Sequence, residues 1–232
     1  MTRALLCCLP LLMCPTAVAA TPAEIIILAG ASSKEEGEKA FDKAKADMRD
    51  WADDVTPAAG FPKLIESGTV SGLKPGFFVT VWGVCTKAND PALPLLDIAR
   101  TTVKGPYART VQWPNAALPC PTSRGVITMS TKTKHGEIVV ATTASNGIRG
   151  WAALITKDGT LKAREKISEG AMSCDGHDDA VAGGGVEVWA HCVMQSCTQP
   201  EEGDINVKVK AKSATELTVK TKYTETVKCV ND

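Results

Sequence analysis

Apolar and polar residues follow two different periods along the chain, and the change of period divides it into two parts. In residues 21–114, apolar runs that end in glycine precede stretches with apolar residues at three- and four-residue spacing, as in buried strands followed by amphipathic helices. From residue 123 onward, apolar residues fall in short runs or alternate with polar ones. We therefore predict an α+β domain over 21–114, a Pro-rich linker over 115–122 and an all-β antiparallel domain over 123–232.

The first part reads as strand, helix, strand, strand, helix, strand. A run from Glu24 to Ala29 ends at Gly30, and Ser33 with Glu36 forms a capping box that starts the first helix. Further strands are expected near 64–65, 77–83 and 107–113, with a second helix that Asp90 and Pro91 start and 104–106 ends. The apolar stripe of the first helix is interpreted as core: Ala40, Phe41, Ala44, Met48, Trp51 and Ala52.

Residues 23–114 resemble the sporulation-related repeat, or SPOR domain. The motifs that carry the resemblance are the strand ending at Gly30, the Ser-Ser-Lys-Glu-Glu helix start at 32–36, the Gly-Phe-Pro segment at 60–62 and the second strand-glycine-helix unit. The resemblance implies a four-stranded sheet backed by two helices that binds peptidoglycan glycan strands across its open face. The chain departs from the family at Leu28, where a polar residue is usual, and lacks the usual aromatic residue between Ala31 and Ser33.

The second part contains about seven segments that alternate or cluster like strands. They are 126–129, 137–141, 151–155, 160–163, 186–190, 205–212 and 217–227. Asp158 and Gly159 favour a hairpin between two of them, because Asp-Gly readily adopts the tight turn. The spacing is typical of a β-sandwich or barrel.

The N-terminus has the features of a signal peptide over residues 1–20. Arg3 precedes an apolar run from 4 to 13, and small residues at 16–20 suit cleavage after Ala19 or Ala20. A lipid-attachment box at Cys14 is disfavoured, because Met13 occupies a position that normally needs a small residue. No other stretch reaches the 18 or so apolar residues of a membrane helix. We expect a secreted or periplasmic protein.

Six cysteines remain after the expected cleavage: Cys85, Cys120, Cys174, Cys192, Cys197 and Cys229. An even number in an exported chain predicts three disulfides, each contributing about 2–4 kcal/mol, with 15 pairings possible. The two-part organisation favours Cys85 with Cys120. Within the remaining four, local pairing favours Cys174 with Cys192 and Cys197 with Cys229.

Charge excludes one class of partner. The chain has 26 basic and 26 acidic residues, and loss of Arg3 leaves a net charge of −1. Nothing in this balance favours bulk attraction to nucleic acid. Two series of lysines alternate or partly alternate with other residues: Lys208, Lys210 and Lys212, and Lys220, Lys222 and Lys228. The two series form a basic ribbon if their strands pair in a suitable register. An anionic polymer or lipid head group could use it, although lysines on an exposed face more simply confer solubility.

The strongest candidate for metal chemistry is the segment 173–179 with His191. His177, Asp178 and Asp179 are ligand types that metal sites use. Their spacing fits no known zinc or calcium motif, and a solvated loop is the simpler interpretation. The chain has no Gly-x-Ser-x-Gly elbow, and its other histidine, His135, is interpreted as a turn residue. Gly183 to Gly185 is interpreted as a flexible connection. We assign no catalytic, cofactor-binding or metal-binding residues.

These features predict an exported, non-catalytic protein of the bacterial envelope that binds cell-wall glycan or another envelope component. One alternative is a metal-dependent hydrolase that uses His177, Asp178, Asp179 and His191. Another is a structural scaffold in which the β domain docks an envelope protein.

Overall fold

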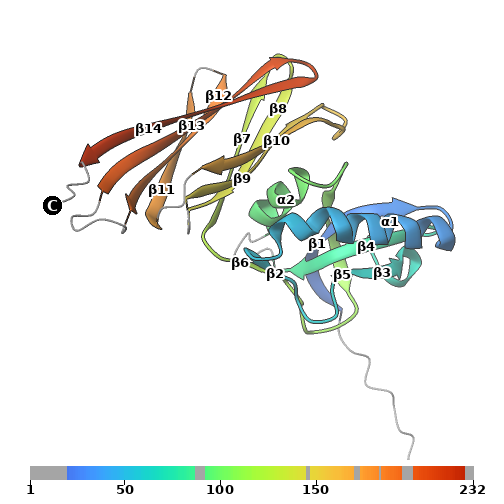
Figure 1. Ribbon diagram of the computed structural model, residues 1–232. Helices are drawn as coiled ribbons and strands as arrows, with labels where there is room; N and C mark the ends of the chain where they lie inside the picture. The colour runs from blue at the N-terminus through green and yellow to red at the C-terminus, as the bar shows by residue number, and fades with distance from the viewer. Residues whose placement is uncertain are drawn as a thin grey trace, which may run out of the picture.

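Two parts, each built around antiparallel sheets, make up the fold of the computed structural model, which describes residues 20–86, 92–144, 147–169, 173–182, 184–194 and 201–227 (Figure 1). The N-terminal part contains β1 (Thr21–Ala31), α1 (Lys34–Asp47), the 3₁₀ helix η1 (Met48–Trp51), β2 (Val55–Thr56), β3 (Lys63–Glu66), the 3₁₀ helix η2 (Ser67–Thr69), β4 (Phe78–Cys85), α2 (Ala92–Arg100) and β5 (Tyr107–Trp113). The C-terminal part contains β6 (Thr122–Ser123), β7 (Val126–Thr133), β8 (Gly136–Thr143), β9 (Ile148–Ile155), β10 (Leu161–Glu169), β11 (Ser173–Ala182), β12 (Gly185–Met194), β13 (Glu201–Ser213) and β14 (Glu216–Val227).

The N-terminal sheet has the order β3-β4-β1-β5, with all neighbouring strands antiparallel. Strand β1 is central because its run of β-branched residues is buried on both faces. Ile26 and Leu28 pack toward the helices, whereas Ile25 and Ile27 pack on the opposite face. The predicted four-stranded sheet with two helices is confirmed.

Helix α1 begins as predicted and ends at Asp47, before the last residues of the predicted apolar stripe. The Ser33 hydroxyl accepts a hydrogen bond from the Glu36 amide at 3.3 Å, which satisfies one of the free amides of the first turn. After Asp47 the chain tightens into η1, and Trp51 is buried with its indole Nε1 donating to Thr101 Oγ1 at 3.3 Å. The prediction that Ala52 belongs to the core is wrong, because the 3₁₀ turn rotates that residue out to solvent.

Two four-stranded sheets, β10-β9-β8-β7 and β11-β12-β13-β14, form the C-terminal part. Their inner faces share one apolar core that includes Ile138 and Leu154 from the first sheet and Val188 and Val207 from the second. Of the two predicted architectures, sandwich or barrel, this is a sandwich. The Asp158-Gly159 hairpin is confirmed, since Gly159 has φ +80° and its amide donates to the Thr156 carbonyl at 2.9 Å.

Strand β11 corrects the interpretation of 173–179 as a solvated loop. Residues 173–182 form the edge strand of the second sheet and pair with β12, with Cys174 opposite Cys192 and Ala182 opposite Gly185. The polar composition favours a loop locally, but pairing with a buried strand and a disulfide across it override that preference. The interpretation of Gly183 to Gly185 as a flexible connection is wrong for Gly185, which is the first residue of β12 and pairs with Ala182; Gly184 before it has φ +73°, and Gly183 lies outside the described residues.

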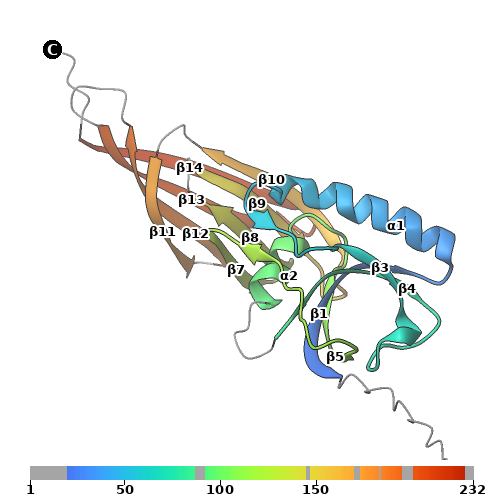
Figure 2. The same ribbon diagram turned by 90° about the horizontal axis from the view of Figure 1, so that it is seen from below.

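Helix α2 joins the two parts. It lies between the N-terminal sheet and the strands of the first C-terminal sheet in both views (Figure 1, Figure 2). Leu95, Ile98 and Ala99 pack with Trp82 of β4 and also with Ala141 of β8 in one apolar cluster. The helix therefore buries one side on each part of the chain.

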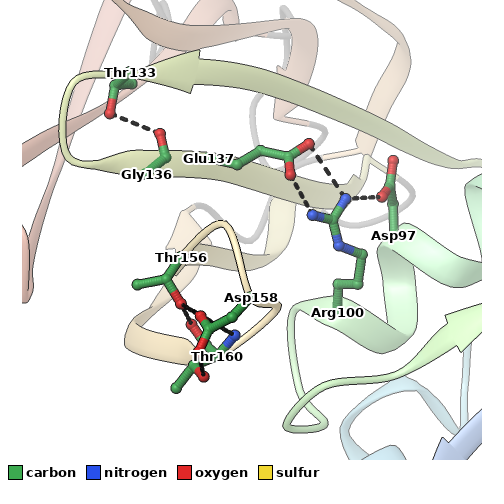
Figure 3. A network of polar contacts seen from close by, with 8 residues as sticks. All are labelled: Asp97, Arg100, Thr133, Gly136, Glu137, Thr156, Asp158 and Thr160. Atoms are coloured by element: carbon green, nitrogen blue, oxygen red, sulfur yellow. Dashed lines mark hydrogen bonds and ion pairs between the residues drawn. The ribbon is translucent and has the colours of Figure 1, made fainter.

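Ion pairs lie around the contact between the two parts of the chain. The guanidinium of Arg100 contacts both carboxylate oxygens of Glu137, at 3.3 Å from Nη1 to Oε1 and through a second short contact from Nη2, and Nη1 also donates to Asp97 at 3.0 Å (Figure 3). Burial raises the pKa of Asp97, although its hydrogen bond with Arg100 opposes this. The hydrogen bond from Arg100 holds the pKa of Glu137 below its usual range, against the effect of burial.

Two arginines of the first C-terminal sheet also reach the N-terminal part, at η1 and the turn that follows it. Arg149 lies 2.7 Å from Asp54, and Arg164 lies 2.7 Å from Asp50 while its guanidinium stacks on Trp151 at 3.4 Å. Burial raises the pKa of Asp54, and Arg149 lowers it in opposition. The two ion pairs therefore join the C-terminal part to the N-terminal part, whereas the cation–π contact lies within the C-terminal part and holds the Arg164 guanidinium in place.

We expect Glu137→Gln to lower the free energy of unfolding at pH 7 by about 1–3 kcal/mol, because it removes a charged partner of a largely buried guanidinium. Since the pKa of Glu137 is lowered in the folded state, its stabilisation is present above the ordinary glutamate pKa of about 4.3 and is lost as the pH falls below it. Urea midpoints of variant and parent at pH 7 and pH 3 measure this. A stability difference that is the same at both pH values would contradict it.

The matched control is Glu216→Gln. Glu216 pairs with Lys212 at 2.7 Å, and both side chains are at least half exposed. Exposed pairs contribute little to stability, so this variant should unfold at the parent's urea concentration at both pH values.

Within the described residues there are two disulfides, Cys85–Cys120 and Cys174–Cys192, and both are pairs that the sequence favoured. Cys197 and Cys229 lie outside the described residues. The Cys85–Cys120 bond holds the predicted linker 115–122 against the N-terminal sheet, where the Val84 amide donates to the Pro119 carbonyl at 2.9 Å. Disulfides of this kind are typical of proteins from oxidising compartments.

Candidate functional site

The helix-free face of the N-terminal sheet is mostly covered. Ile25, Ile27 and Val81 are fully buried there, under apolar residues from outside the sheet. The covering residues come from the segment before β4 and from the segment after β5: Val70, Leu73, Phe77 and Leu118. The open face that the SPOR resemblance implies is therefore closed along most of its length.

A groove of about 760 Å³ remains at one end of this face. It lies where β1 extends past the start of β5. Its walls come from the end of β1, the segment before β4, the turn after α2 and the start of β5. The lining residues are Leu28, Ala29, Gly30, Ser67, Gly72, Leu73, Lys74, Phe77, Val79, Lys104, Gly105, Tyr107 and Arg109.

Strand direction explains why these segments meet. Both β4 and β5 run antiparallel to β1, so both strands begin beside the end of β1, with Phe78 opposite Ala31 and Tyr107 opposite Ile27. A turn precedes each start, and each turn begins with a lysine: Lys74-Pro75-Gly76 and Lys104-Gly105-Pro106. Two lysines distant in sequence thereby reach the same groove.

Hydrogen bonds hold the segment before β4 in place. The Ser67 amide donates to the Phe77 carbonyl at 2.8 Å, and the Phe77 amide donates to the Ser67 hydroxyl at 3.0 Å. Gly72 lies so close to β5 that a Cβ there would approach the Val111 Cα to 3.1 Å, at a φ of +103°. The groove wall is therefore fixed before any ligand arrives, which lowers the entropic cost of binding.

Three cationic side chains and two aromatic rings give the groove its chemistry. The Lys74 ammonium lies 5.6 Å from the centre of the Phe77 ring, and the Arg109 guanidinium lies 6.0 Å from that of Tyr107. Tyr107 is 41% exposed, an unusual value for a large apolar side chain of this protein. Among the described residues that line the groove there is no carboxylate. Such a surface suits an anionic ligand with flat or extended groups.

The described lysines of the predicted basic ribbon lie on the paired strands β13 and β14, whereas Lys228 lies outside the described residues. Lys208 lies directly opposite Lys220, and Lys222 lies opposite Asn206. However, Glu187 of β12 approaches Lys208 to 3.0 Å and Glu216 pairs with Lys212. These carboxylates partly neutralise the ribbon, which makes the groove the stronger candidate for an anion.

The residues of the metal hypothesis are only partly described. His177, Asp178 and Asp179 belong to β11, but their side chains lie outside the described part of the structure. His191 is on β12 with its Nδ1 3.0 Å from Asp204, and both side chains are about half exposed. Among the side chains that the structure places, no three His, Cys, Asp or Glu residues form a group able to hold a metal ion.

Other predicted features take simple structural roles. His135 occupies the turn between β7 and β8, and its amide donates to Thr133 Oγ1 at 3.1 Å.

In the residues the structure describes, none of the helices has the length and apolar character to cross a membrane.

Comparisons with known proteins add no family. No protein-family model matches the chain, and neither a curated protein nor a solved structure matches it.

Proposed function

We propose that this protein acts by binding, as an exported, non-catalytic component of a bacterial envelope that holds peptidoglycan in the groove at the end of β1. The observation that carries the proposal is the composition of the groove, with Lys74, Lys104 and Arg109 beside Tyr107 and Phe77 and no carboxylate among the described lining residues. Peptidoglycan offers the matching chemistry, because it combines sugars, which stack on aromatic rings, with free carboxylates.

Two further observations support this assignment. The Cys85–Cys120 and Cys174–Cys192 disulfides fit life in an oxidising compartment outside the cytoplasm. The resemblance of residues 23–114 to the SPOR family suggests the same polymer from independent features, namely the motifs at 32–36 and 60–62.

Co-sedimentation of the full-length protein with purified peptidoglycan tests the proposal. We expect the double charge reversal Lys74→Glu with Arg109→Glu to weaken retention at least about tenfold, because each substitution replaces an attraction by a repulsion. Raising the salt concentration should weaken retention by the parent protein as well, since the cations are exposed.

The control carries the same change of charge elsewhere. Lys220→Glu with Lys222→Glu alters two exposed lysines of the basic ribbon on β14 and should leave retention close to that of the parent. Equal losses for both double variants would mean that net charge, and not the groove, governs binding. No retention of the parent protein at low salt would overturn the proposal.

A further inference from the structure

One edge of β1 lacks a neighbouring strand where it forms the wall of the groove. On one side, β1 pairs with β4 as far as Ala31 opposite Phe78. On the other side, its pairing with β5 ends at Ile27 opposite Tyr107. Leu28 lies at an irregularity of the β1–β4 register and has no partner in either ladder. Residues 29–31 are paired on one side only, among the strands that the structure describes, and two of them, Ala29 and Gly30, line the groove.

The chain itself prevents β5 from covering this edge. Pro106 precedes β5 and has no amide hydrogen to donate to a ladder. Gly105 has φ +70°, a conformation that does not continue an extended strand. A strand edge with free amides and carbonyls is a template for another extended chain, and here it stands inside a cationic groove.

We propose that the groove takes a short, extended peptide that carries carboxylates and pairs with residues 29–31 of β1. The inference rests on the proposed function and identifies the peptide stems of peptidoglycan, and not its sugar strand, as the recognised part. Main-chain hydrogen bonds to the β1 edge hold the peptide, and the cations of Lys74, Lys104 and Arg109 bind its carboxylates.

The dimensions agree with such a ligand. An added strand rises about 3.4 Å per residue, so an edge of three residues accommodates a peptide of roughly three or four. The groove volume of about 760 Å³ lies within the usual range of roughly 300–1,000 Å³ for sites that enclose small ligands.

Side-chain direction also agrees. Tyr107 and Arg109 lie two residues apart on β5, opposite Ile27 and Ile25, and so share the helix-free face of the sheet. A peptide that continues the line of β5 lies beside this face, so its carboxylates reach the aromatic and cationic residues of the groove.

Modified peptides test the inference without changing the protein. The probe is a fluorescein-labelled tetrapeptide stem released from peptidoglycan, with its binding to the full-length protein followed by anisotropy. Three modified forms are compared with it: one with its carboxyl groups converted to amides, and two in which backbone nitrogens are methylated at alternate residues.

We expect the amide form to bind at least about tenfold more weakly, since it loses charge-assisted hydrogen bonds. Of the two methylated forms, one should lose at least about tenfold and the other much less, because only alternate amides of a paired strand face its neighbour. Two methylated forms that bind alike would overturn strand pairing, and an amide form that binds as well as the stem would overturn recognition of its carboxylates.

A second comparison separates this inference from the proposed function. Sugar strands stripped of their peptides by an amidase are offered alongside intact peptidoglycan. Retention on intact material with loss on stripped strands supports the inference. Equal retention on both overturns the inference while the proposed function stands, and no retention on either overturns both.

Discussion

Gly150→Ala should lower the free energy of unfolding by about 4 kcal/mol or more, a loss of the size seen when a substitution overpacks the core and strains the backbone together. Gly150 is a buried residue of β9 opposite Thr142 of β8. A Cβ at this position would lie 2.0 Å from the Ala141 carbonyl oxygen and 2.8 Å from the Thr142 Cα. Both contacts are with backbone, so no side-chain rotation relieves them, and β8 and β9 must separate.

Gly159→Ala is the matched control. Gly159 also has a positive φ, of +80°, but nothing lies within 4 Å of a Cβ there. The Gly159→Ala substitution should lower the free energy of unfolding by only about 1–2 kcal/mol, which is the conformational cost of a non-glycine residue in the left-handed region. Urea unfolding followed by circular dichroism measures both variants. Equal losses would show that the approach of β8 to β9 does not decide the stability at Gly150.

The second large effect concerns the Cys85–Cys120 disulfide. Replacement of both cysteines by alanine should lower the free energy of unfolding by about 3–4 kcal/mol, because the bond closes a long loop in the unfolded chain. The separation is 35 residues here and 18 for Cys174–Cys192, so the corresponding loss for Cys174 and Cys192 should be slightly smaller. Cys85 is also fully buried beside the helices, so its replacement adds a packing defect.

Thermal unfolding under non-reducing conditions measures this difference. We expect the double Cys85/Cys120 variant to melt roughly 10 °C below the parent, given roughly 2–4 °C per kcal/mol for a chain of this size. Full reduction of the parent protein should lower its melting temperature to nearly that of the variants. An unchanged melting temperature after full reduction would contradict a stabilising role for either disulfide.

The order of elements in the N-terminal part could be predicted because local signals agree with the fold there. The predicted strand over 107–113 matches β5 residue for residue, and the Ser33 cap forms as expected. In contrast, β11 was missed because its Asp- and Gly-rich sequence has little strand propensity. Its structure depends on pairing with β12, which is a long-range contact that local composition does not report.

The groove was missed for a topological reason. Lys74, Lys104 and Arg109 are up to 35 positions apart in the printed sequence, and no short motif links them. One signal was available, since each lysine begins a Pro- and Gly-containing turn directly before a predicted strand. Its meaning depends on strand order, because the two turns meet only if both strands run antiparallel to β1 and lie beside it.

The contacts of α2 had no signal in the sequence. The amphipathic pattern of 93–103 identifies a buried face, but not which sheet covers each side of the helix. The structure places Ala141 and Trp151 of the C-terminal part in the same cluster as Leu95 and Ile98. Pro-rich composition at 115–122 therefore marks a change of architecture in a chain whose two parts share apolar surface.

This shared helix sets an order on folding as the chain is made or passes through a membrane pore. Strands β1 to β5 can associate once residue 113 has emerged, but the second side of α2 stays bare until β8 and β9 follow. The last of these strands ends at Ile155, more than 40 residues later. A nascent chain paused in that interval would present an uncovered apolar helix face, the surface that holdase chaperones bind.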